Sequence, residues 1–130
     1  MGKQFTLAKT ERLKSRKLMD ELFRSGKKFS LPPFRITYTY LPAANPGVQL
    51  GAGVSSKVFK KAPDRNRIKR LIREAWRLQK KELLLQVRQQ KKQLPVFIIY
   101  AGNEIPEYTQ VLSAVGKIIQ KITTIVNTEK

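Results

Sequence analysis

The sequence predicts an α/β (α+β) fold in which one sheet is backed by helices. Segments with the alternating or continuous apolar pattern of strands are interleaved with segments whose apolar residues recur at helical spacing. No repeat, low-complexity tract or linker divides the 130 residues, a length that suffices to bury one hydrophobic core. We therefore expect a single domain over residues 1–130, with residues 1–9 as a flexible N-terminal arm.

The first predicted helix covers residues 15–24, with Ser15 as a suitable N-cap. Gly26 stands where a glycine commonly ends a helix. The apolar residues of this segment fall on one helical stripe, formed by Leu18, Met19, Leu22 and Phe23.

Two strands should come next. Residues 34–41 alternate with period two and are rich in β-branched and aromatic side chains. Residues 42–47 contain Pro, Asn and Gly, and should reverse the chain into a second strand through Leu50 and Val54. The two glycines inside that second segment weaken it as a strand.

An amphipathic helix then begins near Pro63, as a first-turn residue, or is capped by Asp64. Its apolar stripe consists of Ile68, Leu71, Ile72, Ala75 and Trp76. The continuous apolar run 95–101 predicts a strand covered on both faces, and Pro106 opens a last helix. Because the basic helix would connect the strand ending at Val54 to the apolar strand, those two strands should be parallel.

Charge is the dominant feature of the composition. The chain has 27 Lys and Arg against 9 Asp and Glu, a net charge of +18 that repels itself unless a polyanion or counterions screen it. Nucleic acid accounts for this most simply. A membrane surface would also attract the charge, but no stretch approaches the roughly 20 apolar residues that span a bilayer, and no signal-peptide pattern follows Met1. We expect a cytoplasmic protein.

The charge is concentrated on the basic helix. Residues 57–92 contain 14 Lys and Arg and 3 acidic residues, which is +11 of the +18. A helical projection gathers the cations and Asn66 on one face, with Glu74 as its single acid: Arg65, Asn66, Arg67, Lys69, Arg70, Arg73, Arg77, Lys80 and Lys81. An ordinary solvated helix is the alternative, but such helices usually mix Glu with Lys four residues apart, whereas like charges at that spacing repel. A row of phosphates would offset the repulsion.

RNA is favoured over double-stranded DNA as the partner. The sequence has no helix-turn-helix, zinc-finger or zipper pattern, and Asn66 is suited to sugar hydroxyls or a base edge. The chain also lacks Cys and His, which excludes thiolate metal sites and the Ser-His-Asp and Cys-His arrangements. We expect no catalytic side chain and no protein-bound metal.

At the basic helix the sequence resembles the bacterial ribonuclease P protein family. Residues 65–76, Arg-Asn-Arg followed by Ile-Lys-Arg-Leu-Ile-Arg-Glu-Ala-Trp, are similar to the family's R-N-R core and its I-K-R-x-x-R-E-x-[FW] continuation. Residues 51–57 resemble the family's G-x-x-[VT]-x-K-K strand end, although Ser56 replaces the first lysine of the pair. The resemblance extends over about residues 10–125, in the same succession of elements.

This resemblance implies an α-β-β-β-α-β-α sandwich with a mixed sheet, a minor first strand at 27–30 and a left-handed βαβ crossover carrying the R-N-R helix. It also implies that an RNA subunit is the catalyst and binds most of the Mg²⁺ cofactor. The protein, as the subunit of an endoribonuclease, would bind that RNA and the 5′ leader of precursor tRNA, and would be monomeric within the ribonucleoprotein.

The resemblance also implies two sets of site residues. The RNA-binding set is Arg65, Asn66, Arg67, Lys69, Arg70 and Arg73, with Lys57, Lys60 and Lys61 as nearby phosphate contacts. The family's leader-binding cleft uses aromatics from the first helix and the sheet, for which the candidates are Phe23, Phe34 and Tyr38. Met19 stands where the family often has another aromatic. Ordinary core packing is the alternative for these cleft residues.

Two other functions compete with this one. Charge alone would also suit a structural RNA-binding protein such as a ribosomal component. A protein-only nuclease would need a carboxylate cluster to bind its metal, and the candidate acids, Asp20, Glu21, Glu104 and Glu107, are scattered along the sequence.

Overall fold

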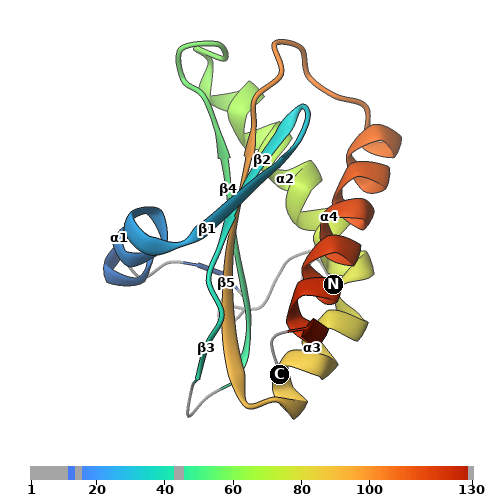
Figure 1. Ribbon diagram of the computed structural model, residues 1–130. Coiled ribbons are helices and arrows are strands. Elements are labelled where there is room, and N and C mark those ends of the chain that lie inside the picture. Colours follow the sequence, from blue (N-terminus) through green and yellow to red (C-terminus); the bar gives the residue numbers. More distant parts are fainter. Residues whose placement is uncertain (1–11, 14–15, 43–45, 129–130) are drawn as a thin grey trace, which may run out of the picture.

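The structure of the protein is a computed structural model that describes residues 12–13, 16–42 and 46–128; the predicted arm at 1–9 lies outside them. One five-stranded sheet has helices on both faces (Figure 1). The elements are, in chain order, α1 (Arg16–Ser25), β1 (Lys27–Leu31), β2 (Phe34–Tyr38), β3 (Leu41–Pro42), β4 (Gly47–Val54), α2 (Ala62–Gln79), α3 (Lys81–Gln89), β5 (Lys92–Tyr100) and α4 (Tyr108–Thr128). The predicted α+β class and the minor first strand are confirmed.

The last strand in the sequence, β5, is central in the sheet. It pairs antiparallel with β2 on one side and parallel with β4 on the other, and β1 lies outside β2. The parallel pairing of β4 and β5, which α2 and α3 connect, confirms that these two strands are parallel. The left-handedness of the crossover stays a prediction. Although the chain reverses after β3, β4 does not pair with the strand before it, because β5 lies between them.

The predicted strand 34–41 is interrupted after Tyr38. Thr39 donates its N–H to the carbonyl of Pro95 in β5 at 3.2 Å, and Pro95 has no N–H to donate in return. The ladder therefore breaks, and it resumes as β3 where Leu41 pairs with Gln93.

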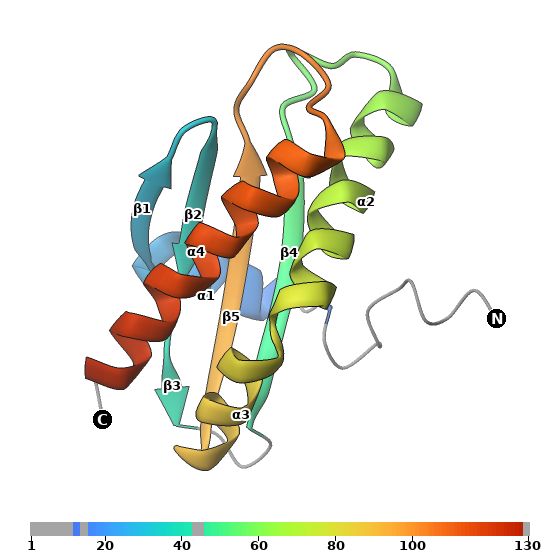
Figure 2. The same ribbon diagram turned by 90° about the vertical axis from the view of Figure 1, so that its right-hand side faces the viewer.

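The three C-terminal helices and α1 cover opposite faces of the sheet. Figure 2 shows α2 and α4 lying across one face, where they contact each other. The core fills the space between this face and the helices, with Ile36, Ile98, Ile72, Trp76 and Ile122 among its fully buried side chains. On the opposite face lies α1, whose one buried residue is Leu22.

Three predicted boundaries are corrected. Lys61 occupies the N-cap position of α2 without a side-chain cap, so Asp64 lies in the first turn and does not cap the helix. A separate helix, α3, follows α2, and its buried Leu83 and Val87 keep helical spacing. The apolar strand begins at Lys92, before the predicted run, because pairing with β3 and β4 extends it.

Candidate nucleic-acid interface

The cationic face of α2 points away from the core. Its buried residues, Ile68, Ile72, Ala75 and Trp76, account for the apolar stripe. On the other face Asn66, Arg67 and Arg70 are exposed, and Lys69 and Arg73 are half-buried. The helix thus holds five of the predicted RNA-binding residues on one accessible surface.

The single acid of this face is already paired. Arg77 donates hydrogen bonds to both carboxylate oxygens of Glu74, at 2.7 and 3.2 Å. This hydrogen bond, together with the negative charge of Glu74, raises the pKa of Arg77. Glu74 therefore does little to neutralise the cations on the preceding turns.

The loop before α2 carries the three predicted lysines. Lys57, Lys60 and Lys61 are exposed, while Phe59 between them is buried beside the ring of Tyr100, with ring centroids 6.2 Å apart. The loop is closed by hydrogen bonds from the N–H of Phe59 to the Ser55 carbonyl at 3.0 Å and from Lys57 N–H to Ser55 Oγ at 3.3 Å.

Arg65 differs from the other predicted contacts. Its Nη1 donates to the carbonyl of Phe59 at 2.7 Å, so part of the side chain ties the loop to the first turn of α2. We assign Arg65 a positioning role for the three lysines as well as a positive charge.

A second candidate surface lies on the opposite face of the sheet, beside α1. Here a hollow of about 360 Å³ is lined by Phe23, Lys28, Phe29, Ser30, Arg35, Ile36, Thr37 and Ile99; we call it the α1 cleft. Phe23 is 40% exposed and packs edge to face on Phe97, with ring centroids 5.0 Å apart. Lys28 and Arg35 are exposed and supply positive charge beside these rings.

The glycines of β4 make room for Phe97. A Cβ on Gly51 would lie 2.5 Å from the Phe97 ring, and a Cβ on Gly53 would lie 2.8 Å from it. Both distances are shorter than carbon contacts allow, so the ring can rest across β4 only because these two residues have no side chain.

The prediction is wrong for two of the cleft residues, which do not line the cleft. Phe34 and Tyr38 are 2% and 5% exposed and belong to the core on the far side of the sheet, which bears out the alternative of core packing. Because side chains alternate along a strand, the cleft receives Arg35 and Thr37 of β2 instead. Phe23 borders the cleft as predicted; Met19, in the same helix, is half-buried and does not line the hollow.

The sequence prediction missed Phe97, Lys28 and Arg35. The apolar run 95–101 predicts a strand covered on both faces, but Phe97 and Ile99 are half-buried because α1 covers that face incompletely. The available signal was the strand period, since Arg35 and Thr37 occupy the positions between three apolar residues.

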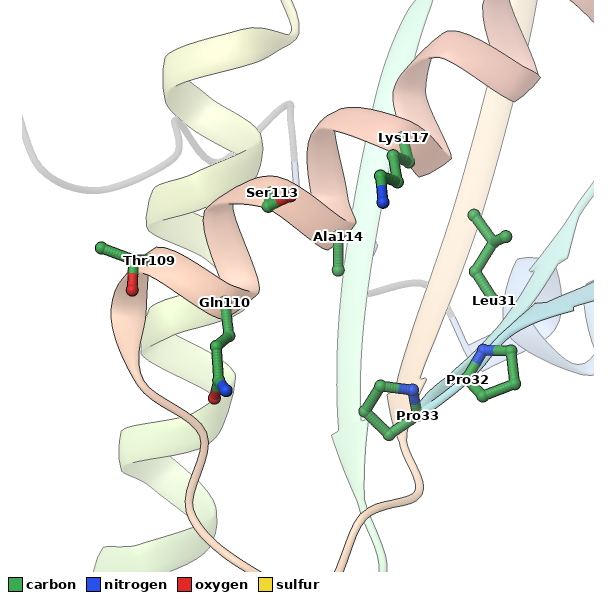
Figure 3. A pocket seen from close by; sticks show the side chains of 8 residues that line it. All are labelled: Leu31, Pro32, Pro33, Thr109, Gln110, Ser113, Ala114 and Lys117. Carbon is green, nitrogen blue, oxygen red and sulfur yellow. The ribbon is translucent and has the colours of Figure 1, made fainter.

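Another hollow, of about 520 Å³, lies between the β1–β2 turn and α4 (Figure 3). Its lining combines Leu31, Pro32, Pro33 and Ala114 with the polar Thr109, Gln110 and Ser113, and Lys117 is its one charged side chain. With no aromatic ring and a single cation, it is a poorer nucleic-acid site than the α1 cleft.

No helix in the described ranges is long and apolar enough to cross a membrane. Nor does this part of the chain gather three or more His, Cys, Asp or Glu side chains into a group that would hold a metal ion.

A sheet with a cationic helix on one layer and a basic, aromatic cleft on the other defines a basic α+β protein of the nucleic-acid-binding class. The sequence model of the family described as ribonuclease P matches residues 7–123. The chain therefore belongs to the ribonuclease P protein family, and it is a protein component of that tRNA-processing endoribonuclease.

Individual relatives agree with this assignment. The ribonuclease P protein component of Porphyromonas gingivalis is 33% identical over 120 residues, covering 91% of this chain and 87% of the relative. That of Syntrophus aciditrophicus is 32% identical over 120 residues, covering 92% of each.

Solved structures share the fold. The ribonuclease P protein from Thermotoga maritima superposes with a TM-score of 0.67 at 22% identity, covering 85% of this chain and 96% of that one. The Staphylococcus aureus protein gives a TM-score of 0.64 at 22% identity, covering 86% and 94%.

Proposed function

We propose that this chain binds the catalytic RNA subunit of ribonuclease P through α2 and the preceding loop, and holds the 5′ leader of precursor tRNA in the α1 cleft. The observation that carries the proposal is the exposed cationic face of α2, whose single acid is paired with Arg77. Such a face is stable beside a row of phosphates, which Arg binds through paired hydrogen bonds.

Each surface suits a different form of RNA. The exposed Arg67, Arg70 and three loop lysines lie on a convex helix and loop, which fits the backbone of a folded RNA. The α1 cleft is a hollow that offers the exposed ring of Phe23 for stacking on an unpaired base, with Lys28 and Arg35 for the phosphates.

In this proposal the protein supplies charge and shape, and the RNA supplies the chemistry. We assign the magnesium ions mainly to the RNA subunit, whose phosphates are ligands that Mg²⁺ favours. By neutralising phosphates, the protein would lower the magnesium concentration at which the RNA binds its substrate. We propose a monomeric protein within a cytoplasmic ribonucleoprotein.

Reconstitution tests the function. Purified protein added to the cognate catalytic RNA should restore removal of the leader from precursor tRNA at low magnesium concentration. If the protein gives no stimulation there and footprints only on ribosomal RNA, the structural RNA-binding role is correct instead.

The α1 cleft has its own test in the same assay. Phe23→Ala should raise KM for a precursor with a leader of several nucleotides, and should leave KM unchanged for a precursor with a one-nucleotide leader. Phe34→Leu in the core is the matched control, because it changes an aromatic residue outside the cleft. Equal effects of Phe23→Ala on both substrates would remove Phe23 from the leader site.

A further inference from the structure

Two described residues that precede α1, Arg12 and Leu13, are attached to β4 at the edge of the sheet. Leu13 donates its N–H to the Leu50 carbonyl at 3.0 Å, and Arg12 forms an isolated parallel bridge with Leu50 of β4. Leu13 is 6% exposed, so this attachment is part of the packed structure. It fixes Arg12 beside β4, a strand that α2 also contacts.

Arg73 of α2 lies within range of the positive charges of Arg12 and Arg70. Burial, and then the positive charges of Arg12 and Arg70, lower the pKa of Arg73. Arg12 and Arg70 are thus each close enough to Arg73 to repel it, and water screens the half-buried Arg73 less than it screens a group on an open surface. Nothing in the sequence pattern indicates this, because Arg12 and Arg73 are far apart along the chain.

The cluster also has an unsatisfied donor. The Nε of Arg12 is inaccessible to solvent and has no hydrogen-bond partner. Across the described ranges, no carboxylate lies within ion-pair distance of Arg12, Arg70 or Arg73. A buried N–H of a charged group without an acceptor is unfavourable, and native proteins rarely leave one so.

We propose that Arg12, beside β4, forms with Arg70 and Arg73 of α2 a binding site for one phosphate group of an RNA backbone. A phosphate would accept hydrogen bonds from the terminal nitrogens of the three guanidinium groups and offset the repulsion that Arg12 and Arg70 exert on Arg73. It would reach the buried Arg12 Nε only if that side chain moves on binding. The site rests on the proposed function for its ligand, but adds a contact from outside α2 and its loop.

Inorganic phosphate is the first probe, with the full chain in a phosphate-free, low-salt buffer. In NMR spectra of the arginine Nε–H groups, the signals of Arg12, Arg70 and Arg73 should shift together with one titration curve. Arg16, an exposed cation of α1, should shift only at phosphate concentrations at least tenfold higher. A response of Arg12 that matches that of Arg16 would overturn the proposal.

Substitution gives the second test. Arg12→Gln should weaken phosphate binding about tenfold, whereas Arg16→Gln removes the same charge and should change it less than twofold. Arg12→Lys keeps the positive charge but lacks the planar guanidinium group, so on a logarithmic scale it should recover less than half of the phosphate affinity that Arg12→Gln loses. Full recovery would show that a positive charge at this position suffices, and would contradict a site that depends on the guanidinium geometry. Because Arg12→Gln relieves repulsion, its melting temperature without phosphate should be no lower than that of the wild type, and if it does not fold, Arg12→Lys decides alone.

Two RNA ligands separate the sources of the phosphate. A leader oligonucleotide and the catalytic RNA are each titrated into wild-type, Arg12→Gln and Arg16→Gln proteins. If Arg12→Gln, and not Arg16→Gln, binds one of these RNAs about tenfold more weakly than the wild type, that RNA is the source of the phosphate. If Arg12→Gln binds both RNAs as tightly as the wild type, the proposed site is rejected. These outcomes can be told apart from those of the reconstitution assay. If Arg12→Gln supports cleavage and binds RNA with unchanged affinity, only the phosphate site is rejected. If the wild type binds phosphate as expected but no cleavage is reconstituted, only the proposed function is rejected.

Discussion

At the scale of single residues, the α1 cleft depends on two missing side chains. Phe97 lies across Gly51 and Gly53, and its ring supports the exposed ring of Phe23. The same glycines weaken β4 as a strand, because glycine loses more conformational freedom on folding than any other residue. The loss of conformational freedom at Gly51 and Gly53 is offset by the close approach of the Phe97 ring to the backbone, which only glycine allows.

Gly51→Ala should therefore destabilise the protein by about 1–3 kcal/mol, because the new methyl group would force the Phe97 ring aside. Gly47→Ala is the matched control in the same strand, since a Cβ there would meet nothing within 4 Å. Urea unfolding of both variants measures the difference. Equal stabilities would show that Phe97 moves at no cost.

Tyr100 gives the stability a dependence on high pH. Its hydroxyl donates to the Glu104 carbonyl at 2.6 Å, and burial followed by the charge of Glu104 raises the pKa of the phenol. The folded state therefore favours the protonated form, so this contribution is complete below the unfolded pKa of about 10 and is lost as the pH rises through the folded pKa.

Tyr100→Phe cannot ionise, so its free energy of unfolding should fall less than that of the wild type between about pH 9 and pH 11. Lysine titration affects both proteins alike, and the difference isolates Tyr100. Parallel pH profiles from urea unfolding would contradict this account.

At the scale of elements, α2 separates stability from binding on its two faces. Ile72 is fully buried, whereas Arg67 is exposed on the cationic face. The apolar spacing predicted this division correctly, because a helix with a period of 3.6 residues turns every third or fourth side chain to the core.

Arg67→Ala should weaken binding to the catalytic RNA and reduce the slope of log affinity against log salt by about 1, with stability unchanged within about 0.5 kcal/mol. Ile72→Ala should lower the free energy of unfolding by about 2–5 kcal/mol and leave the salt slope unchanged. Filter binding and urea unfolding of both variants check the pair. The division fails if Arg67→Ala is the less stable of the two.

The strands were less predictable than α2. Alternation in residues 34–38 correctly indicates a strand, but it does not say which face meets the core when both faces are partly covered. Phe34 and Tyr38 therefore suited the cleft and the core equally well, until pairing of β2 with β5 placed them beside Tyr100 and Val96. The missed helix α3 and the interruption at Thr39 likewise depend on neighbours that are remote in sequence.

At the scale of the whole molecule, positive charge occurs on both layers. The α2 layer carries the R-N-R helix, and the α1 layer carries Lys28 and Arg35 beside the cleft. A net charge of +18 on 130 residues makes any RNA complex strongly dependent on salt.

If the protein neutralises about 6 phosphates, its affinity for the catalytic RNA should fall about a thousandfold between roughly 50 and 200 mM salt. Titrations at four or more salt concentrations measure the slope. A nearly flat response would mean that contacts other than ion pairs dominate binding.

The sequence by itself determined the α+β class, the amphipathic basic helix and the parallel crossover, because periodicity and charge are local properties of the chain. Its motif at Arg65-Asn66-Arg67 also indicated the family that the comparisons confirm. Only the tertiary structure decided which residues line the α1 cleft, that Arg65 supports the loop, and that Arg12 lies near Arg73. These depend on strand pairing, and on which side chains from remote segments meet, and the free energy of those contacts exists only once the chain has folded.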